Sequence, residues 1–199
     1  MNRVSTSQSP MVRTKRMDSF VLLLLAASLA LNVYLGWKLR QGSPNTRQNT
    51  VTLSPGMKID PVTVVTLDGI QHTISYENTN KPTVLYVLSP ACIWCDRNNA
   101  NFKRLSELRA KDFRFIGLSL AEPGLKAYVD AHHLKFPVYT RLTTESINAL
   151  GLGSTPQTIV ISPDGRVLKN WIGAYLDPLR PEVEAYFGIT LPGLTSDND

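Results

Sequence analysis

Residues 83–95 read TVLYVLSPACIWC, an apolar run followed by a Ser-Pro break and two cysteines. The run is rich in residues that favour strands, and it is apolar enough for a strand that is buried on both faces. Ser89-Pro90 ends this run directly before Ala91 and Cys92. The stretch therefore predicts a central strand that leads into a helix beginning at the cysteine pair.

Cys92 and Cys95 are the only cysteines of the chain. Two thiols at this spacing can form a disulfide, and the partial positive charge of a helix N-terminus stabilises a thiolate and lowers its pKa. A zinc site is one alternative, but zinc normally needs four nitrogen or sulfur ligands, and no second cysteine pair is present. A structural disulfide is another, but so short a loop would constrain the unfolded chain little. The pattern favours redox chemistry with Cys92 as the reactive thiol.

Residues 19–37 (SFVLLLLAASLALNVYLGW) form an uncharged apolar stretch that is long enough to cross a membrane as a helix. Tyr34 and Trp37 lie toward its C-terminal end, where interfacial aromatic residues are expected. A cleaved signal peptide is the alternative, since residues 28–30 resemble a cleavage site. Residues 31–37 continue apolar past that point, which favours an uncleaved anchor.

The net charge of +5 is unevenly distributed along the chain. Residues 1–50 contain seven Lys or Arg and one acid, whereas residues 51–199 contain 14 Lys or Arg and 15 acids. Basic residues beside an apolar segment suit anionic lipid head groups, so we expect contact with membrane lipid. The nearly neutral remainder offers no basic stripe for phosphates, so nucleic-acid binding is not expected.

Whether residues 19–37 are an anchor or a signal peptide, they would direct the rest of the chain across the membrane. Four basic residues precede the apolar stretch and three follow it, a weak bias for a cytoplasmic N-terminus. We therefore expect a single-pass protein of the cytoplasmic (inner) membrane with its folded domain on the extracytoplasmic, periplasmic side. The expected organisation is a basic tail (1–18), an anchor (19–37), a flexible tether (38–50), a folded domain (51–190) and a disordered tail (191–199).

Alternation around Asp68-Gly69 predicts a hairpin of residues 63–67 and 70–74. Helical spacing from Cys95 to Leu108 predicts one amphipathic helix that runs to about Ala110. Further strands are expected at 113–120, 136–139, 157–161 and 166–172, and further helices at 125–133, 145–150 and 179–187. This order predicts an α/β layer sandwich with a mixed central sheet.

Several of these features together resemble the thioredoxin fold in its membrane-anchored TlpA/ResA-like branch of thiol–disulfide oxidoreductases. The resemblance covers residues 59 to 187, most of the part that follows the tether. It is carried by Lys81-Pro82 before the buried strand, Cys92-Ile93-Trp94-Cys95, Gly153-Ser154-Thr155-Pro156, Ser162-Pro163-Asp164-Gly165 and Gly173. It implies a thioredoxin-like three-layer sandwich with a redox-active disulfide between Cys92 and Cys95.

The resemblance also implies a substrate groove. Pro156 would have a cis peptide bond and face the disulfide, and Thr155 would offer its backbone to an extended substrate segment. Trp94, between the two cysteines, is assigned to the same substrate-binding surface. The alternative for Pro156 is an ordinary trans proline at the start of a strand.

The chain departs from the family pattern at four positions near the cysteines. Ala91 and Trp94 stand where many members carry Trp and Pro, respectively. Tyr86 and Asn98 stand where thioredoxins and many TlpA-like members carry a buried acid. Asp96 adjoins Cys95, but it is expected to be a solvent-facing acid in the first turn of the helix.

Two other branches of this fold, the copper chaperones and the peroxidases, fit the sequence less well. Copper chaperones would use the two thiols and a histidine, but His132-His133 near a helix end is expected to lie on the surface. Peroxidases expect a Pro-x-x-x-Thr-x-x-Cys pattern, and the corresponding residues here are Leu85 and Ser89.

The sequence thus predicts a membrane-tethered thiol–disulfide oxidoreductase with neither a metal nor a cofactor. Cys92 would attack a disulfide of a client protein, and Cys95 would resolve the mixed disulfide. The partners would be client proteins bearing disulfides or thiols and a membrane electron-donor thiol protein, and a role in cytochrome c maturation is what the resemblance implies. The alternative is a tethered metallochaperone or thiol-dependent binding module.

Overall fold

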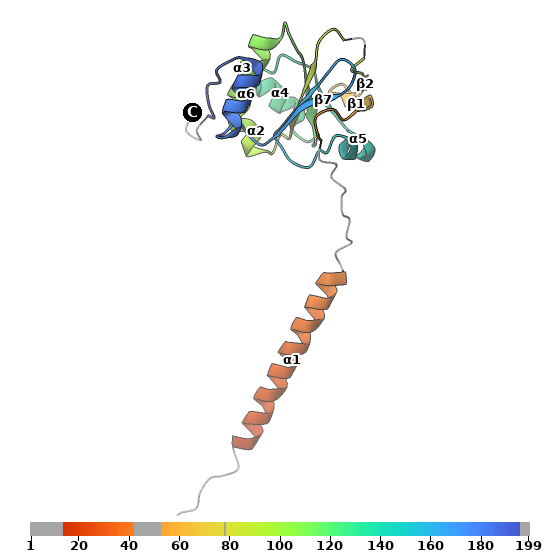
Figure 1. Ribbon diagram of the computed structural model, residues 1–199. Coiled ribbons are helices and arrows are strands. Elements are labelled where there is room, and N and C mark those ends of the chain that lie inside the picture. The colour runs from red at the N-terminus through yellow and green to blue at the C-terminus, as the bar shows by residue number, and fades with distance from the viewer. Residues whose placement is uncertain (1–13, 42–52, 78, 196–199) are drawn as a thin grey trace, which may run out of the picture. The chain divides into compact units, whose positions relative to one another are not determined.

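The structure is a computed structural model that describes residues 14–41, 53–77 and 79–195 (Figure 1). It contains two separate compact units, residues 1–47 and residues 48–199. Within the expected basic tail, residues 1–13 lie outside the described part. So do residues 42–50 of the expected tether and residues 196–199 at the C-terminus.

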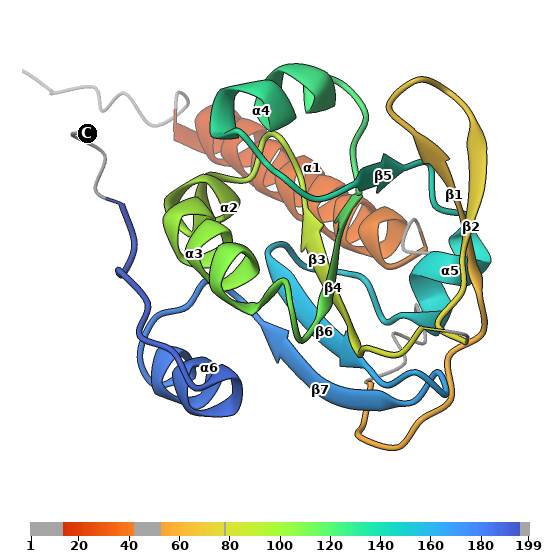
Figure 2. The ribbon, with the colours of Figure 1, turned by 90° about the horizontal axis from the view of Figure 1, so that it is seen from above.

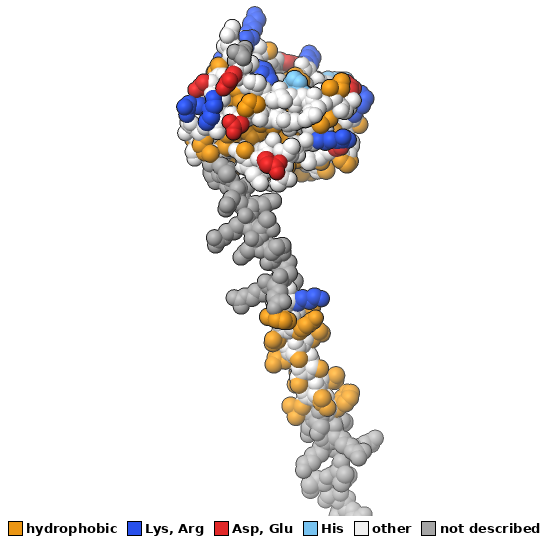
Figure 3. Space-filling model, turned by 90° about the vertical axis from the view of Figure 1, so that its right-hand side faces the viewer, with side chains coloured by type: hydrophobic (Ala, Val, Ile, Leu, Met, Phe, Trp, Pro, Cys, Tyr) orange, Lys and Arg blue, Asp and Glu red, His pale blue; other side chains and the backbone are white. Residues whose placement is uncertain are grey.

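The first unit contains the helix α1 (Thr14–Gln41). Its segment Phe20–Lys38 has a mean hydropathy of 2.0, and none of it is buried within the protein. Figure 3 shows hydrophobic side chains along the described part of this segment. By length and composition, α1 is able to cross a membrane.

The second unit is built around a mixed sheet of seven strands in the order β2-β1-β5-β4-β3-β6-β7. β3, β4 and β5 are parallel to one another, and the remaining neighbours are antiparallel. The strands are β1 (Val62–Thr66), β2 (Gln71–Ile74), β3 (Thr83–Leu88), β4 (Arg114–Ser119), β5 (Val138–Thr140), β6 (Gln157–Ile161) and β7 (Val167–Ile172). The predicted thioredoxin-like architecture with a mixed sheet is confirmed.

Helices cover both faces of this sheet. The helices of the unit are α2 (Ile93–Arg97), α3 (Asn99–Arg109), α4 (Leu125–His132), α5 (Thr144–Ala149) and α6 (Leu179–Phe187). Figure 2 shows α2, α3 and α6 on one side of the sheet and α5 on the other. These layers form the predicted three-layer sandwich.

The central strand β3 is buried along its whole length because both of its faces meet apolar side chains. Val84, Tyr86 and Leu88 face a core shared with α3, α4 and α6. Leu85 and Val87 face a second core that includes residues of the β1–β2 hairpin and the end of α5. This two-sided burial explains why residues 83–88 alternate so little in polarity.

The segment from Leu191 to Thr195 corrects the prediction of a disordered tail from residue 191 onward. Leu191 is buried, and the Gly193 N–H donates to Asn101 Oδ1 at 2.8 Å. The Thr195 N–H donates to the carbonyl oxygen of Arg97 at 3.0 Å. The segment therefore packs against α2 and α3, which a short sequence of two leucines, Pro, Gly and Thr at the end of the chain did not indicate.

Candidate active site

The cysteine pair lies at the end of β3 and the start of α2, where the sequence places it. Ser89 and Pro90 end the strand, and the Cys92 N–H donates to the carbonyl oxygen of Ser89 at 3.0 Å. Cys92 has extended backbone angles and is the N-cap of α2. Its sulfur therefore lies at the positive end of the helix, where a thiolate is stabilised.

Cys92 and Cys95 form a disulfide. The Cys95 N–H donates to Cys92 Sγ at 3.1 Å. Cys95 is fully buried in the core, whereas Cys92 is only partly buried. The hydrogen bond and the exposure both make Cys92 the better nucleophile of the reduced pair.

Thr155 and Pro156 precede β6, the antiparallel neighbour of β3, and this pairing brings them to the disulfide. The Thr155-Pro156 peptide bond is cis, as the resemblance implied. Cys92 Sγ lies 3.4 Å from the carbonyl oxygen of Thr155. A second cis bond, Asp177-Pro178, precedes α6 and was not predicted.

Trp94 lies between the cysteines with 43% of its surface exposed, and the neighbouring Ile93 is 58% exposed. The Arg97 guanidinium lies 5.2 Å from the centre of the Trp94 ring. The site therefore presents two apolar side chains beside the partly buried Cys92. The assignment of Trp94 and Thr155 to substrate binding remains a prediction.

A buried polar network lies beneath the site and is centred on Asn98. Asn98 Oδ1 accepts hydrogen bonds from the Tyr175 N–H and from Asn101 Nδ2, both at 3.0 Å. Asn98 Nδ2 donates to the Tyr86 hydroxyl at 3.4 Å. The two positions where relatives carry a buried acid are thus occupied by a neutral pair of side chains that contact each other.

The tyrosines of this network stay neutral near physiological pH. Burial raises the pKa of Tyr86 well above its usual value. Burial likewise raises the pKa of Tyr175, whose hydroxyl lies 2.7 Å from Thr158 Oγ1. Neither side chain can therefore take up a proton from the Cys95 thiol as a buried carboxylate could.

Asn98 also corrects the prediction of one continuous helix from Cys95 to Ala110. The helix is interrupted at Asn98, which ends α2 and caps α3. The Asn98 side chain bonds to the backbone of Tyr175 in the loop after β7 instead of pointing to solvent. A polar residue three positions after Cys95, on the core-facing stripe, was the available signal.

Asp96 is an exposed acid in the first turn of α2, as expected, whereas His132 is less exposed than the surface residue expected there. Asp96 Oδ1 lies 2.9 Å from His132 Nε2, and their side chains are 59% and 22% exposed. Asn99 Nδ2 lies 2.9 Å from the other ring nitrogen, Nδ1. The end of α4 is therefore linked to the helices that carry the cysteines, whereas His133 is exposed as expected.

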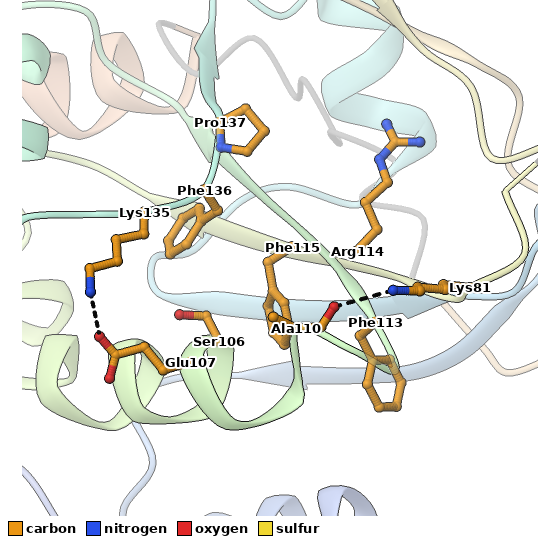
Figure 4. A pocket seen from close by; sticks show the side chains of 10 residues that line it. All are labelled: Lys81, Ser106, Glu107, Ala110, Phe113, Arg114, Phe115, Lys135, Phe136 and Pro137. Atoms are coloured by element: carbon orange, nitrogen blue, oxygen red, sulfur yellow. Dashed lines mark hydrogen bonds and ion pairs between the residues drawn. The ribbon is translucent and has the colours of Figure 1, made fainter.

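A cavity of about 580 Å³ is lined by residues of α3, of β4 and of the segment before β5 (Figure 4). Its lining includes Lys81 just before β3, Arg114 at the start of β4, and Phe136. Cys92 follows the opposite end of β3, so the cavity and the disulfide lie toward opposite ends of this strand. Among the described residues, no group of three or more His, Cys, Asp or Glu side chains is placed to hold a metal ion.

Solved structures of several bacterial proteins share this fold. The thioredoxin domain of a thiol–disulfide oxidoreductase from Bacteroides vulgatus has a TM-score of 0.56 at 17% identity, covering 68% of this chain and 99% of that chain. A thiol:disulfide interchange protein from Bacteroides sp. has a TM-score of 0.54 at 18% identity, covering 68% and 91%. A thioredoxin family thiol:disulfide interchange protein from Chlorobium tepidum has a TM-score of 0.51 at 21% identity, covering 61% and 88%.

No curated protein sequence matches the chain significantly. Residues 55–170 match the sequence profile of the AhpC/TSA family. This region includes the hairpin β1–β2, the cysteine pair, the Thr155-Pro156 bond and most of β7. The chain belongs to the AhpC/TSA family of thioredoxin-fold proteins, and it carries the two-cysteine site of a thiol–disulfide oxidoreductase.

Proposed function

We propose that this protein is a membrane-tethered, extracytoplasmic reductase of disulfides in client proteins. The position of Cys92 carries the proposal. Its sulfur is at a helix N-terminus, accepts a hydrogen bond from the Cys95 N–H and is more accessible than Cys95. This combination suits a thiolate nucleophile whose resolving partner is protected from solvent.

In the reduced protein, the Cys92 thiolate attacks one sulfur of a client disulfide. The client S–S bond breaks, its second sulfur leaves as a thiolate that takes up a proton, and a mixed disulfide forms on Cys92. Cys95 then loses its proton and attacks Cys92 Sγ, which releases the client as a dithiol. Two electrons have passed to the client, and a membrane electron-donor thiol protein returns the pair to the dithiol state.

The surface beside Cys92 suits a polypeptide client. Ile93 and Trp94 offer exposed apolar contacts on one side of the sulfur. The carbonyl oxygen of Thr155, 3.4 Å from Cys92 Sγ, offers a backbone acceptor on the other. An extended client segment could pair with this backbone while its apolar side chains contact Trp94.

The proposed location depends on α1. Its apolar segment is long enough to span the hydrocarbon core of a membrane. An extracytoplasmic compartment is also where client disulfides persist. A role in cytochrome c maturation is one assignment of this type that the resemblance supports.

The full-length protein in detergent is expected to accelerate the reduction of insulin by dithiothreitol and to purify without bound copper or zinc. Turbidity from the released insulin B chain and elemental analysis of the same sample measure both properties. Hydrogen peroxide consumption provides a third readout. It is expected to be slow, because Leu85 and Ser89 stand where the peroxidase pattern has Pro and Thr. Stoichiometric copper without insulin reduction would instead support a metallochaperone, and rapid peroxide turnover would support a peroxidase.

A further inference from the structure

His132 forms a bridge between the end of α4 and the helices that follow Cys92. One ring nitrogen, Nε2, lies 2.9 Å from Asp96 Oδ1 on α2, and the other, Nδ1, lies 2.9 Å from Asn99 Nδ2 on α3. The ring centre also lies 4.2 Å from that of Tyr128, one turn earlier on α4. The imidazole is therefore held on three sides, although part of it remains accessible to solvent.

The hydrogen bonds to its two nitrogens determine the tautomer of the His132 ring. With the Asn99 amide donating to Nδ1, the neutral imidazole carries its proton on Nε2 and donates it to the Asp96 carboxylate. A ring protonated on both nitrogens also donates Nε2–H to Asp96, but it can no longer accept from the Asn99 amide, which would have to turn its oxygen toward Nδ1. In both forms the Nε2–H donates to the Asp96 carboxylate and offsets part of its negative charge.

Asp96 is connected to the nucleophile by the geometry of α2. Its N–H donates to the carbonyl oxygen of Cys92 at 3.2 Å, so the two residues are one helical turn apart. Cys92 is the N-cap of α2 and Asp96 lies in its first turn, so both residues are at the same end of the helix. The Asp96 carboxylate therefore opposes a negative charge on Cys92 Sγ, and its interaction with His132 reduces that opposition.

The field of Asp96 also reaches the Tyr128 ring on α4. Burial first, and then the negative charge of Asp96, raise the pKa of Tyr128 to about 12. Tyr128 consequently stays neutral over the range in which histidine titrates.

The helices that the bridge connects carry other charged groups, and on α3 the first of these is Lys103, one turn after Asn99. Arg97 follows Asp96 and contacts the Trp94 ring. Lys126 and Asp130 of α4 pair with each other at 3.6 Å. His133 is exposed at the C-cap of α4.

We propose that His132 is a positioning residue for the exchange reaction: it holds Asp96 and offsets its charge, and thereby favours the Cys92 thiolate. The inference deepens the proposed reductase function and rests on it. Two unit charges about 6–8 Å apart at an effective dielectric constant of roughly 40–80 change an equilibrium by about 2- to 10-fold, which bounds the effect of the whole Asp96 charge on Cys92. Changes of that size are expected in the thiolate fraction of Cys92.

The test is a double-mutant cycle on the reduced full-length protein in detergent, with iodoacetamide as the probe and mass spectrometry to follow Cys92. His132→Ala, which removes the Nε2–H donated to Asp96, is expected to slow Cys92 alkylation by about 2- to 3-fold at neutral pH, and Asp96→Asn is expected to accelerate it by up to about 10-fold. In the Asp96→Asn background, His132→Ala should have no further effect. Equal slowing in both backgrounds would show that His132 only packs the ring of Tyr128, and would overturn the proposal.

A conservative variant separates hydrogen bonding from packing. His132→Gln keeps an N–H donor for Asp96, so its Cys92 should alkylate at close to the wild-type rate. His133→Asn is the matched control, because Asn tolerates the left-handed backbone found there (φ 50°), and its rate should follow the wild type. A rate for His132→Gln as slow as that of His132→Ala would contradict the proposed hydrogen-bonding role.

Insulin reduction by the wild type distinguishes this inference from the function on which it rests. Activity together with an additive cycle would remove the role of His132 and leave the reductase function intact. Absence of insulin reduction with a non-additive cycle would remove the proposed function while the coupling between His132, Asp96 and Cys92 stands.

Discussion

The Cys92→Ser variant is expected to lose insulin reduction by at least about 1,000-fold, because a serine hydroxyl does not ionise near neutral pH and cannot attack a disulfide. Cys95 remains present in this variant, but it is fully buried and cannot substitute for Cys92. The insulin turbidity assay measures the loss. Activity within tenfold of the wild type would show that another group is the nucleophile.

The Cys95→Ser variant loses turnover for a different reason and should accumulate an intermediate. Cys92 keeps its place at the helix N-terminus and still attacks, but no thiol remains to resolve the mixed disulfide. Non-reducing gels should therefore show covalent adducts with client proteins for Cys95→Ser and none for the Cys92→Ser/Cys95→Ser double variant. Adducts formed by Cys92→Ser instead would reverse the two roles.

The second large effect is expected at Asn98. Asn98→Ala leaves the buried Tyr175 N–H and the Asn101 amide without their shared acceptor. Each unpaired buried donor costs about 1–3 kcal/mol, so the free energy of unfolding should fall by about 2–5 kcal/mol. For a domain of this size, the corresponding drop in melting temperature is about 5–15 °C, measurable by the near-ultraviolet circular dichroism of the tertiary fold.

Asn99→Ala is the matched control for this prediction. The Asn99 side chain is only partly buried and contacts His132 at the edge of the helix. Its removal should cost less than about 1 kcal/mol, because water can replace the lost partner. If Asn98→Ala and Asn99→Ala melt within about 2 °C of each other, the buried network does not stabilise the domain as described.

Much of the fold follows from local patterns in the sequence. The apolar run at residues 83–88 is the central strand, and Asp68-Gly69 forms the predicted turn, with Gly69 at φ 83°. The helix at residues 179–187 also has the predicted bounds. These features depend on residues close together in the chain, where hydrophobic period and turn chemistry are informative.

The supporting contacts of the site were not predictable in the same way. Asn98 receives its key hydrogen bond from Tyr175, 77 positions away, and His132 meets Asp96 only because α4 packs beside α2. A polar residue near a helix end is compatible with solvent exposure until its tertiary neighbours are known. The resemblance did place Cys92, Cys95 and the cis bond of Pro156, because these residues form the family's motifs.

The order in which the two thiols react tests the central claim most directly. The fully reduced wild-type protein in detergent is treated with a limiting amount of iodoacetamide, and mass spectrometry of the peptides measures the label on each cysteine over time. Because Cys92 is accessible at the helix N-terminus and Cys95 is fully buried, we predict that Cys92 is modified at least about tenfold faster. Equal labelling, or faster labelling of Cys95, would contradict the assignment of Cys92 as the attacking thiol.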